Sequence, residues 1–250
     1  MKISVIMASF NSEATIGGSI ESFLAQDYPD RELLVIDGAS RDRTAEIAAS
    51  YRSPLISVVS EPDKGIYDGM NKGLARMTGD AFGFLNSDDR YHAADVLSLV
   101  AEGLQNAPIV TGSLRFVRNH DGSPPVRIWR AERYVPGAFR RGWSLPHPTT
   151  YARREVRDAV GEFDISNRSA GDYDWLMRAL EVSGFAHAVL DETLVDMMTG
   201  GESTRGLGAV FRNSMEMLRA RQLRLGAGPV DIALFRNIIR KINQVIEAQR

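Results

Sequence analysis

Residues 2–40, "KISVIMASFNSEATIGGSIESFLAQDYPDRELLVIDGAS", place two apolar, β-branched runs on either side of a helical pattern. The runs at 2–10 and 31–40 are typical of strands. In residues 13–25, between them, apolar side chains recur at the spacing of one helical face. A strand, a helix and a strand in this order predict a parallel pair joined by a crossover helix.

The same alternation continues along the next part of the chain. Helices are expected at 44–51, 66–77 and 96–104, and strands at 55–62, 81–89 and 108–117. This pattern predicts an α/β fold of Rossmann-like type, in which helices flank both faces of a mostly parallel central sheet. Ligands of such sheets bind outside the carboxyl ends of the strands.

Candidate ligand-binding residues stand at the ends of several of the predicted strands. Phe10 and Asn11 follow the first strand, Asp37 ends the second, and Asp88 and Asp89 follow the fourth. Two adjacent carboxylates at the end of an apolar run raise each other's pKa and cost stability. Asp88 and Asp89 therefore indicate either a solvated turn or a site where a cation lies between the protein and an anionic ligand.

The composition describes an ordinary globular protein. The chain has 250 residues, of which 44% are hydrophobic and 25% are charged, and it contains no Cys. We therefore expect neither a disulfide nor a thiolate metal site. Its first residues lack a signal-peptide pattern, and no apolar run is long enough to span a membrane, so we expect a cytoplasmic protein.

Residues 205–250 differ from the rest of the chain in charge. They carry a net charge of +6, whereas residues 1–204 carry −8. Two helices are expected, at 207–225 and 230–248, each with an apolar stripe. One interpretation packs these stripes on the rest of the chain or on a second copy in a homodimer. The other docks them on the inner face of the plasma membrane through basic side chains.

The middle of the chain carries two further features. Residues 126–143 are rich in Arg and aromatic side chains, and residues 169–180, "SAGDYDWLMRAL", predict a helix. Asp172 and Asp174 both lie in the first turn of that helix, two residues apart, so they point to different sides. Acids at this position are favoured by the helix dipole and are also common as helix caps.

Three ordered motifs make the chain resemble the family 2 glycosyltransferases. They are "SVIMASFNSEATIGGSIESFLAQDYPDRELLVIDGASRDRT" at 4–44, "EPDKGIYDGMNKGLARMTGDAFGFLNSDDRY" at 61–91 and "SAGDYDWLMR" at 169–178. Within the family, the resemblance is to the bacterial branch that builds O-antigen and capsule polysaccharide. It covers roughly residues 2–204.

The resemblance implies a GT-A fold, a nucleotide-sugar donor, a divalent cation (Mn²⁺ or Mg²⁺) and inversion by single displacement. The acceptor would be a saccharide or a lipid-linked saccharide. Residues 1–204 would form the catalytic domain, with a donor half at 1–112 and an acceptor half at 113–204. Residues 205–250 would be a basic helical extension.

The resemblance also implies roles for single residues on the donor side. Ala8, Phe10 and Asn11 would line the base and ribose, and Asp37 would bind the nucleobase unless it only forms an Asx turn. Lys64 would meet phosphate, with help from Asn71 and Lys72. Asp89 would ligate the metal, and Asp88 would contact the ribose or support the ion. Asn86 stands where many relatives have Asp.

On the acceptor side, the resemblance implies that Asp172 is the general base, followed by Arg178. Many relatives have Glu-Asp at this point, whereas this chain has Gly171-Asp172. Asp174 is the alternative base, and His147 would face the acceptor.

Rival functions need other signals. A nucleotidyltransferase would carry a Gly-rich basic loop after the first strand, and a dinucleotide oxidoreductase would carry G-x-G-x-x-G there. The sequence at 7–13, "MASFNSE", has neither. A non-catalytic nucleotide-sugar or glycan-binding relative stays open because of Asn86. No nucleic acid partner is expected, because the basic tail lacks interleaved aromatic residues.

Overall fold

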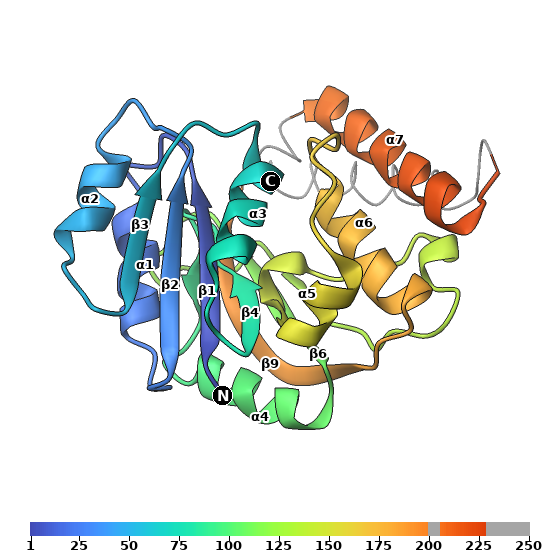
Figure 1. Ribbon diagram of the computed structural model, residues 1–250, viewed down its shortest axis with the longest axis horizontal. Helices are drawn as coiled ribbons and strands as arrows, with labels where there is room; N and C mark the ends of the chain where they lie inside the picture. The colour runs from blue at the N-terminus through green and yellow to red at the C-terminus, as the bar shows by residue number, and fades with distance from the viewer. Residues whose placement is uncertain (200–205, 229–250) are drawn as a thin grey trace.

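The computed structural model describes residues 1–199 and 206–228, without the side chains of residues 206, 207 and 210 (Figure 1). The strands are β1 (Ile3–Ser9), β2 (Arg31–Asp37), β3 (Ile56–Ser60), β4 (Ala81–Phe84), β5 (Arg90–Tyr91), β6 (Ile109–Val117), β7 (Arg127–Trp129), β8 (Thr150–Arg153) and β9 (His187–Met198). The α-helices are α1 (Ile16–Leu24), α2 (Thr44–Ser50), α3 (Ile66–Arg76), α4 (Val96–Asn106), α5 (Arg154–Val160), α6 (Gly171–Met177) and α7 (Gly206–Leu225). Short turns of other helix types are η1 (Phe139–Arg141), η2 (His147–Thr149) and η3 (Arg178–Val182).

The strands form one sheet in the order β3-β2-β1-β4-β8-β6-β9-β5, with β7 paired to β6. β1, β2, β3 and β4 pair in parallel, so Ser9 lies opposite Asp37, and Asp37 lies opposite Ser60. β8 runs antiparallel to both β4 and β6, and β9 pairs in parallel with β6. β6 and β9 therefore run in the same direction as β1 to β4, which confirms the predicted mostly parallel sheet.

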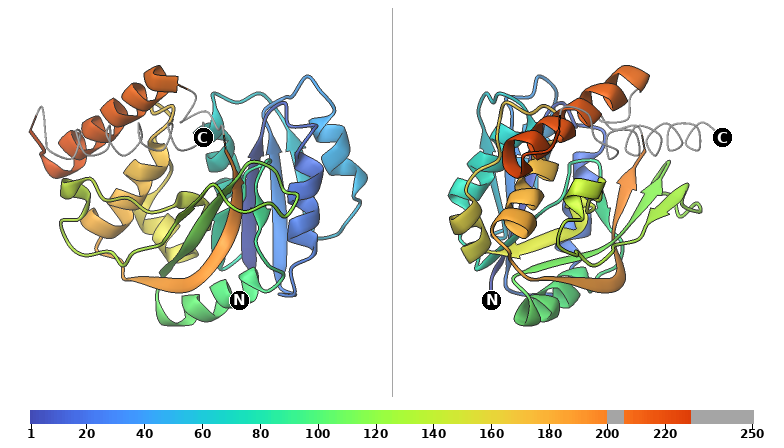
Figure 2. Two further views of the ribbon diagram at one scale, coloured as in Figure 1. Left: turned by 180° about the vertical axis from the view of Figure 1, so that it is seen from behind. Right: turned by 90° about the vertical axis from the view of Figure 1, so that its right-hand side faces the viewer.

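Helices cover both faces of this sheet (Figures 1 and 2). Successive residues of a strand point to opposite faces. Val5 and Met7 of β1 thus join a core with apolar residues of α1 and α4. Ile6, between them, joins a second core with residues of α3, α6 and α7. The first core supports the parallel strands, and the second lies between the sheet and the helices α3, α6 and α7.

In the second half of the sheet only β6 was predicted, by the strand expected at 108–117. β9 lacks a clean alternation of buried and exposed residues, and its pairing with β6 shifts register near Ser113. Its residues take their places through pairing with β6 rather than through a period of their own. The short strands β5, β7 and β8 also went unpredicted, since each spans only two to four residues.

The predicted helix at 207–225 is confirmed by α7, and it packs on the rest of the chain. Met217 and Leu218 are buried, and Leu225 packs against the core that contains α6. The second predicted helix, 230–248, lies outside the described residues. Within residues 1–199 and 206–228, no helix is long and apolar enough to cross a membrane.

Candidate active site

Asp37 holds the turn after β2. Its side chain is fully buried, and its carboxylate accepts hydrogen bonds from the Ser60 hydroxyl at 2.6 Å, from the Ser40 backbone N–H at 3.1 Å and from the Ser40 hydroxyl. The bond from the Ser40 N–H closes an Asx-type turn. The structure therefore favours the turn over the predicted nucleobase contact, because the carboxylate oxygens are already engaged.

The loop after β1 is shaped by that turn. The Ser40 hydroxyl accepts the Asn11 backbone N–H at 2.8 Å, and the Asn11 side-chain oxygen accepts the Arg41 N–H at 2.9 Å. These bonds hold Asn11 at a φ of 49°, in the left-handed region that Asn tolerates better than most residues. The preceding Phe10 is 57% exposed. Its ring is thus an exposed apolar face at the carboxyl edge, where the sequence predicts a residue that lines the base and ribose.

The adjacent carboxylates after β4 occupy different environments. Asp89 is fully buried, and it accepts hydrogen bonds from the Asn86 side-chain amide at 2.8 Å and from the Met198 N–H at 3.2 Å. Asp88 is partly exposed. Burial, and then the charge of Asp88, raise the pKa of Asp89, and burial also raises the pKa of Asp88. Of the two, Asp88 is the carboxylate that an ion could reach without rearrangement.

Asn86 has a specific role in this arrangement. Its amide donates a hydrogen bond to the Asp89 carboxylate, and an ionised Asp at this position would instead add a third negative charge. The departure from the family pattern therefore stabilises the buried carboxylate.

The loop and helix after β3 contain three predicted donor-binding residues. Lys64 is exposed at the carboxyl edge. The ammonium of Lys72 donates to the Pro62 carbonyl at 2.6 Å, so it braces the loop that carries Lys64. Asn71 differs from its predicted role. It is buried, and its amide exchanges two hydrogen bonds with the backbone of Phe163, at 2.9 and 2.8 Å.

Asp172 reaches the same edge from the second half of the chain. Its carboxylate is partly exposed and accepts a hydrogen bond from the Tyr67 hydroxyl at 3.1 Å. Burial, and then the charge of Asp172, raise the pKa of Tyr67, so its hydroxyl stays protonated and donates. The second oxygen, Oδ2, has no donor among the described residues. Tyr67 was missed by sequence reasoning, although it lies in the quoted motif at 61–91.

Gly171 is required for this contact. A Cβ at this position would lie 2.9 Å from atoms of the Tyr67 ring. This close approach gives a physical reason for Gly171, where many relatives have Glu.

His147 lies in an aromatic layer, close enough to Asp172 for that carboxylate to affect its pKa. Its ring is 4.8 Å from that of Phe84 at the end of β4, and the Phe84 ring is 5.5 Å from Phe163. The imidazole is buried, and its Nε2 has no hydrogen-bond partner in the part of the chain that the structure describes. Burial lowers the pKa of His147, against a smaller upward effect of Asp172. A neutral ring with a free nitrogen suits a hydrogen bond to a hydroxyl.

Asp174 and Arg178 form an internal ion pair instead of an acceptor surface. Asp174 is 1% exposed, and its carboxylate accepts hydrogen bonds from Arg178 at 3.0 Å and from Arg224 of α7 at 2.9 Å. Arg178 also donates to the carbonyls of Val160 and Glu162. Asp174 therefore cannot serve as the alternative base without breaking these contacts.

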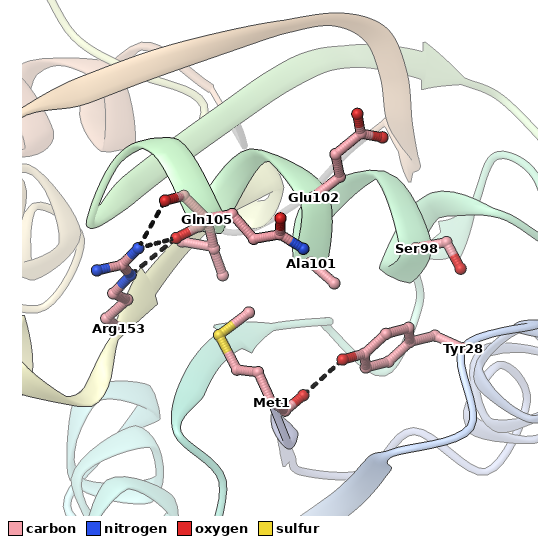
Figure 3. Close-up of a pocket in the computed structure, with 8 residues that line it drawn as sticks. Met1, Tyr28, Ser98, Ala101, Glu102, Gln105 and Arg153 are labelled. Atoms are coloured by element: carbon pink, nitrogen blue, oxygen red, sulfur yellow. Dashed lines mark hydrogen bonds between the residues drawn. The ribbon is translucent and has the colours of Figure 1, made fainter.

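A separate cavity of about 320 Å³ lies at the opposite, amino edge of the sheet (Figure 3). The Tyr28 hydroxyl donates to the Met1 carbonyl at 2.6 Å, and Arg153 donates to the carbonyls of Leu104 and Gln105 at the end of α4. Tyr28 and Arg153 are thus engaged with backbone carbonyls of other residues in the lining. Within the described residues, no group of three or more His, Cys, Asp or Glu could hold a metal ion.

Comparisons with known proteins find similar sequences. Residues 4–164 match the family model described as "Glycosyl transferase family 2". The "Uncharacterized glycosyltransferase Rv1514c" of Mycobacterium tuberculosis is 30% identical over 182 residues, which is 71% of this chain and 68% of that protein.

Two solved structures share the fold. S. aureus TarS 1-349 in complex with UDP-GlcNAc has a TM-score of 0.68 at 21% identity, over 99% of this chain and 81% of that one. The mannosyltransferase PcManGT from Pyrobaculum calidifontis, in complex with GDP-Man and Mn²⁺, has a TM-score of 0.66 at 19% identity, over 98% and 69%. This chain spans 43% of a longer TarS structure. The predicted GT-A type of fold is confirmed by this likeness.

Proposed function

This chain belongs to glycosyl transferase family 2, and from that premise we propose that it is an inverting, metal-dependent enzyme. It moves a sugar from a nucleoside-diphosphate donor to a hydroxyl of a saccharide or lipid-linked saccharide. The observation that carries the proposal is the bond between Tyr67 and Asp172, 3.1 Å long. It joins a carboxylate of the acceptor half to the carboxyl edge of the donor half.

The donor side is built from residues 8–11, Lys64 and Asp88. The exposed ring of Phe10 offers a stacking surface for a nucleobase. The side chain of Ala8 lies against Gly69, so it adds a small apolar surface beside Asn11. Lys64 offers an exposed ammonium for a phosphate. Asp37 shapes this surface through Ser40.

The acidic pair fits a hard divalent cation such as Mn²⁺ or Mg²⁺. Such ions take oxygen ligands and are commonly held by one or two carboxylates together with substrate phosphates and water. Asp88 would be the direct ligand and Asp89 its buried support, which reverses the predicted order, because Asp89 is fully buried. When bound, the ion would neutralise the charge that develops on the departing diphosphate.

Asp172 acts as the general base. It takes the proton of the acceptor hydroxyl as that oxygen bonds to the anomeric carbon. The bond from this carbon to the donor phosphate breaks at the same time, and its electron pair leaves with the nucleoside diphosphate. Tyr67 holds one carboxylate oxygen and leaves Oδ2 to receive the proton. His147, whose pKa is lowered by burial against a smaller upward effect of the charge of Asp172, would face the acceptor from the buried side of the site.

The acceptor class is proposed at its broader level. Family membership fits the assembly of cell-surface polysaccharide and does not single out O-antigen or capsule. The basic and aromatic segment 126–143 contributes several exposed Arg side chains to the acceptor half, which suits an anionic or lipid-linked saccharide.

The test is a panel of nucleotide-sugars with Mn²⁺ or Mg²⁺, scored for nucleoside diphosphate released in the presence of saccharide acceptors. We expect Asp172→Asn to lower kcat by about 10²–10⁴-fold, because a positioned base is lost. Binding of the nucleoside diphosphate, measured by calorimetry, should stay unchanged. Full turnover in Asp172→Asn would refute the assignment of the base.

A further inference from the structure

The first helix of the basic extension is an integral part of the acceptor half. α7 packs against α6 (Figure 1). Three of its residues, Met217, Leu218 and Ala220, are buried, and Arg221 is fully buried with a hydrogen bond to the Tyr173 hydroxyl at 3.2 Å. α7 lies beyond residue 164, where the family match ends, yet it contacts the turn that carries the proposed base.

Glu216 of α7 binds the segment that leads into α6. Its carboxylate accepts the backbone N–H groups of Ser169 at 2.8 Å, Ala170 at 3.0 Å and Arg168 at 3.2 Å. The Ser169 hydroxyl donates to the same carboxylate at 3.0 Å. Ala170 stands at the N-cap of α6, and no side-chain cap bond is made there. Glu216 therefore binds, from another helix, the N–H groups that immediately precede α6. They include the N–H of the N-cap residue Ala170, which in a capping box is bound by a side chain of the first turn.

A second bond fixes the same segment from its carbonyl side. The Asn213 side-chain amide donates to the Ser169 carbonyl at 2.6 Å. Asn213 and Glu216 are three residues apart, so they lie on one face of α7. Ser169, two positions before Gly171, is thus held at both its N–H and its carbonyl.

Arg224 holds the other side of the first turn of α6. It donates to both oxygens of Asp174, at 2.9 and 3.4 Å, and Arg178 donates to the same carboxylate at 3.0 Å. Because Asp174 is buried, loss of one partner leaves a poorly compensated charge. Asp172 and Asp174 point to different sides of the turn, so Arg224 binds the side that faces away from Asp172.

We propose that α7 positions the general base: Glu216 anchors the entry to α6, Arg224 anchors its first turn, and together they fix Asp172 against Tyr67. Both are positioning residues, since neither contacts Asp172 or the reacting atoms. The inference rests on the proposed role of Asp172. Displacement of a reacting group by about 1 Å can lower a rate 10²-fold, so the helix that holds this turn controls kcat.

The first experiment is a double-mutant cycle on the full chain. Glu216→Gln alone should lower kcat by about ten- to a hundred-fold, with nucleoside diphosphate affinity unchanged. In an Asp172→Asn background, the same change should lower kcat no further, because the base it positions is gone. Equal losses in both backgrounds, or weaker nucleotide binding, would show a purely structural role and overturn the proposal.

The second experiment uses Arg224, so that the result does not depend on one variant. Arg224→Ala should lower kcat about ten-fold or more, and Arg224→Lys should restore part of it. Arg212, which is exposed on the same helix, gives the matched control Arg212→Ala, with kcat unchanged. If Arg224→Ala and Arg224→Lys both keep the wild-type kcat, as Arg212→Ala is expected to do, Arg224 does not position the base.

The two proposals fail in different ways. If Asp172→Asn retains full turnover, the base assignment fails whatever the α7 variants do. If Asp172→Asn is inactive while Glu216→Gln and Arg224→Ala are fully active, only the positioning role fails.

Discussion

The two edges of the central sheet treat charge in opposite ways. At the amino edge, Glu32 lies 2.7 Å from the Lys2 ammonium and accepts further hydrogen bonds from Ser4 and Thr78. Arg154, nearby, donates to the carbonyls of Thr78 and Gly79. At the carboxyl edge, Asp88 and Asp89 lie side by side in the chain, and burial raises the pKa of both.

The difference is that the charges at the amino edge stabilise the fold, whereas those at the carboxyl edge are proposed to bind a ligand. Burial alone would raise the pKa of Glu32, but the bonds from Lys2, Ser4 and Thr78 outweigh it and lower the pKa to about 2. A carboxylate with such partners stabilises the fold. The carboxyl edge instead leaves the Phe10 ring, the Lys64 ammonium and one oxygen of Asp172 open. Under the proposed function, these groups would gain their partners when substrate binds.

The largest expected effect comes from Asp88→Asn. It should lower turnover by more than about a hundred-fold, because stabilisation of the leaving diphosphate by a cation is worth several kcal/mol. Nucleoside diphosphate binding should also lose its dependence on Mn²⁺, which calorimetry with and without the ion measures. The matched control is Asp80→Asn at the amino edge, where the Asp80 carboxylate accepts the Lys2 backbone N–H at 2.8 Å and has no other donor among the described residues. An equal loss of activity in both variants would remove the distinction between the edges.

Tyr67→Phe should have an intermediate effect of about ten-fold on kcat, because a hydrogen bond to a charged group is worth about 1.5–3 kcal/mol. KM for the donor should change little, since the Tyr67 hydroxyl binds Asp172, the proposed general base, and not the donor. The control is Tyr91→Phe, which removes the buried bond between the hydroxyls of Tyr91 and Tyr151, 2.6 Å apart, and should affect stability alone. Unchanged kcat in Tyr67→Phe would show that Asp172 is held by other contacts.

The smallest effect is expected from Glu32→Gln. The pKa of Glu32 is lowered from 4.5 to about 2 in the folded protein, so its stabilisation is present above pH 4.5 and is lost as the pH falls toward 2. Screening by solvent keeps the difference in unfolding free energy to about 1 kcal/mol at pH 7. Urea unfolding at pH 7 and at pH 3 measures it, and kcat should not change. A difference that grows at pH 3 would contradict the sign of this linkage.

Much of the site followed from strand ends. Phe10, Lys64 and Asp88 lie within four residues of the ends of β1, β3 and β4, and such positions meet at one edge of a parallel sheet. Tyr67, Glu216 and Arg224 could not be predicted from their local sequence. Each acts through a residue more than forty positions away, at 105, 46 and 50 positions for Asp172, Ala170 and Asp174.

The sequence by itself determined the alternating α/β architecture and the family, because period, turn residues and motifs are local properties. Only the tertiary structure decided which polar residues remain open. Asp37, Asn71, Asp89 and Asp174 are chemically as able to bind a ligand as Asp88 or Asp172. Hydrogen bonds from other strands and helices engage the first four and bury them. The same long-range packing made α7 part of the packed structure, because its buried face is completed by α6, η1 and η3, which are distant from it in the sequence.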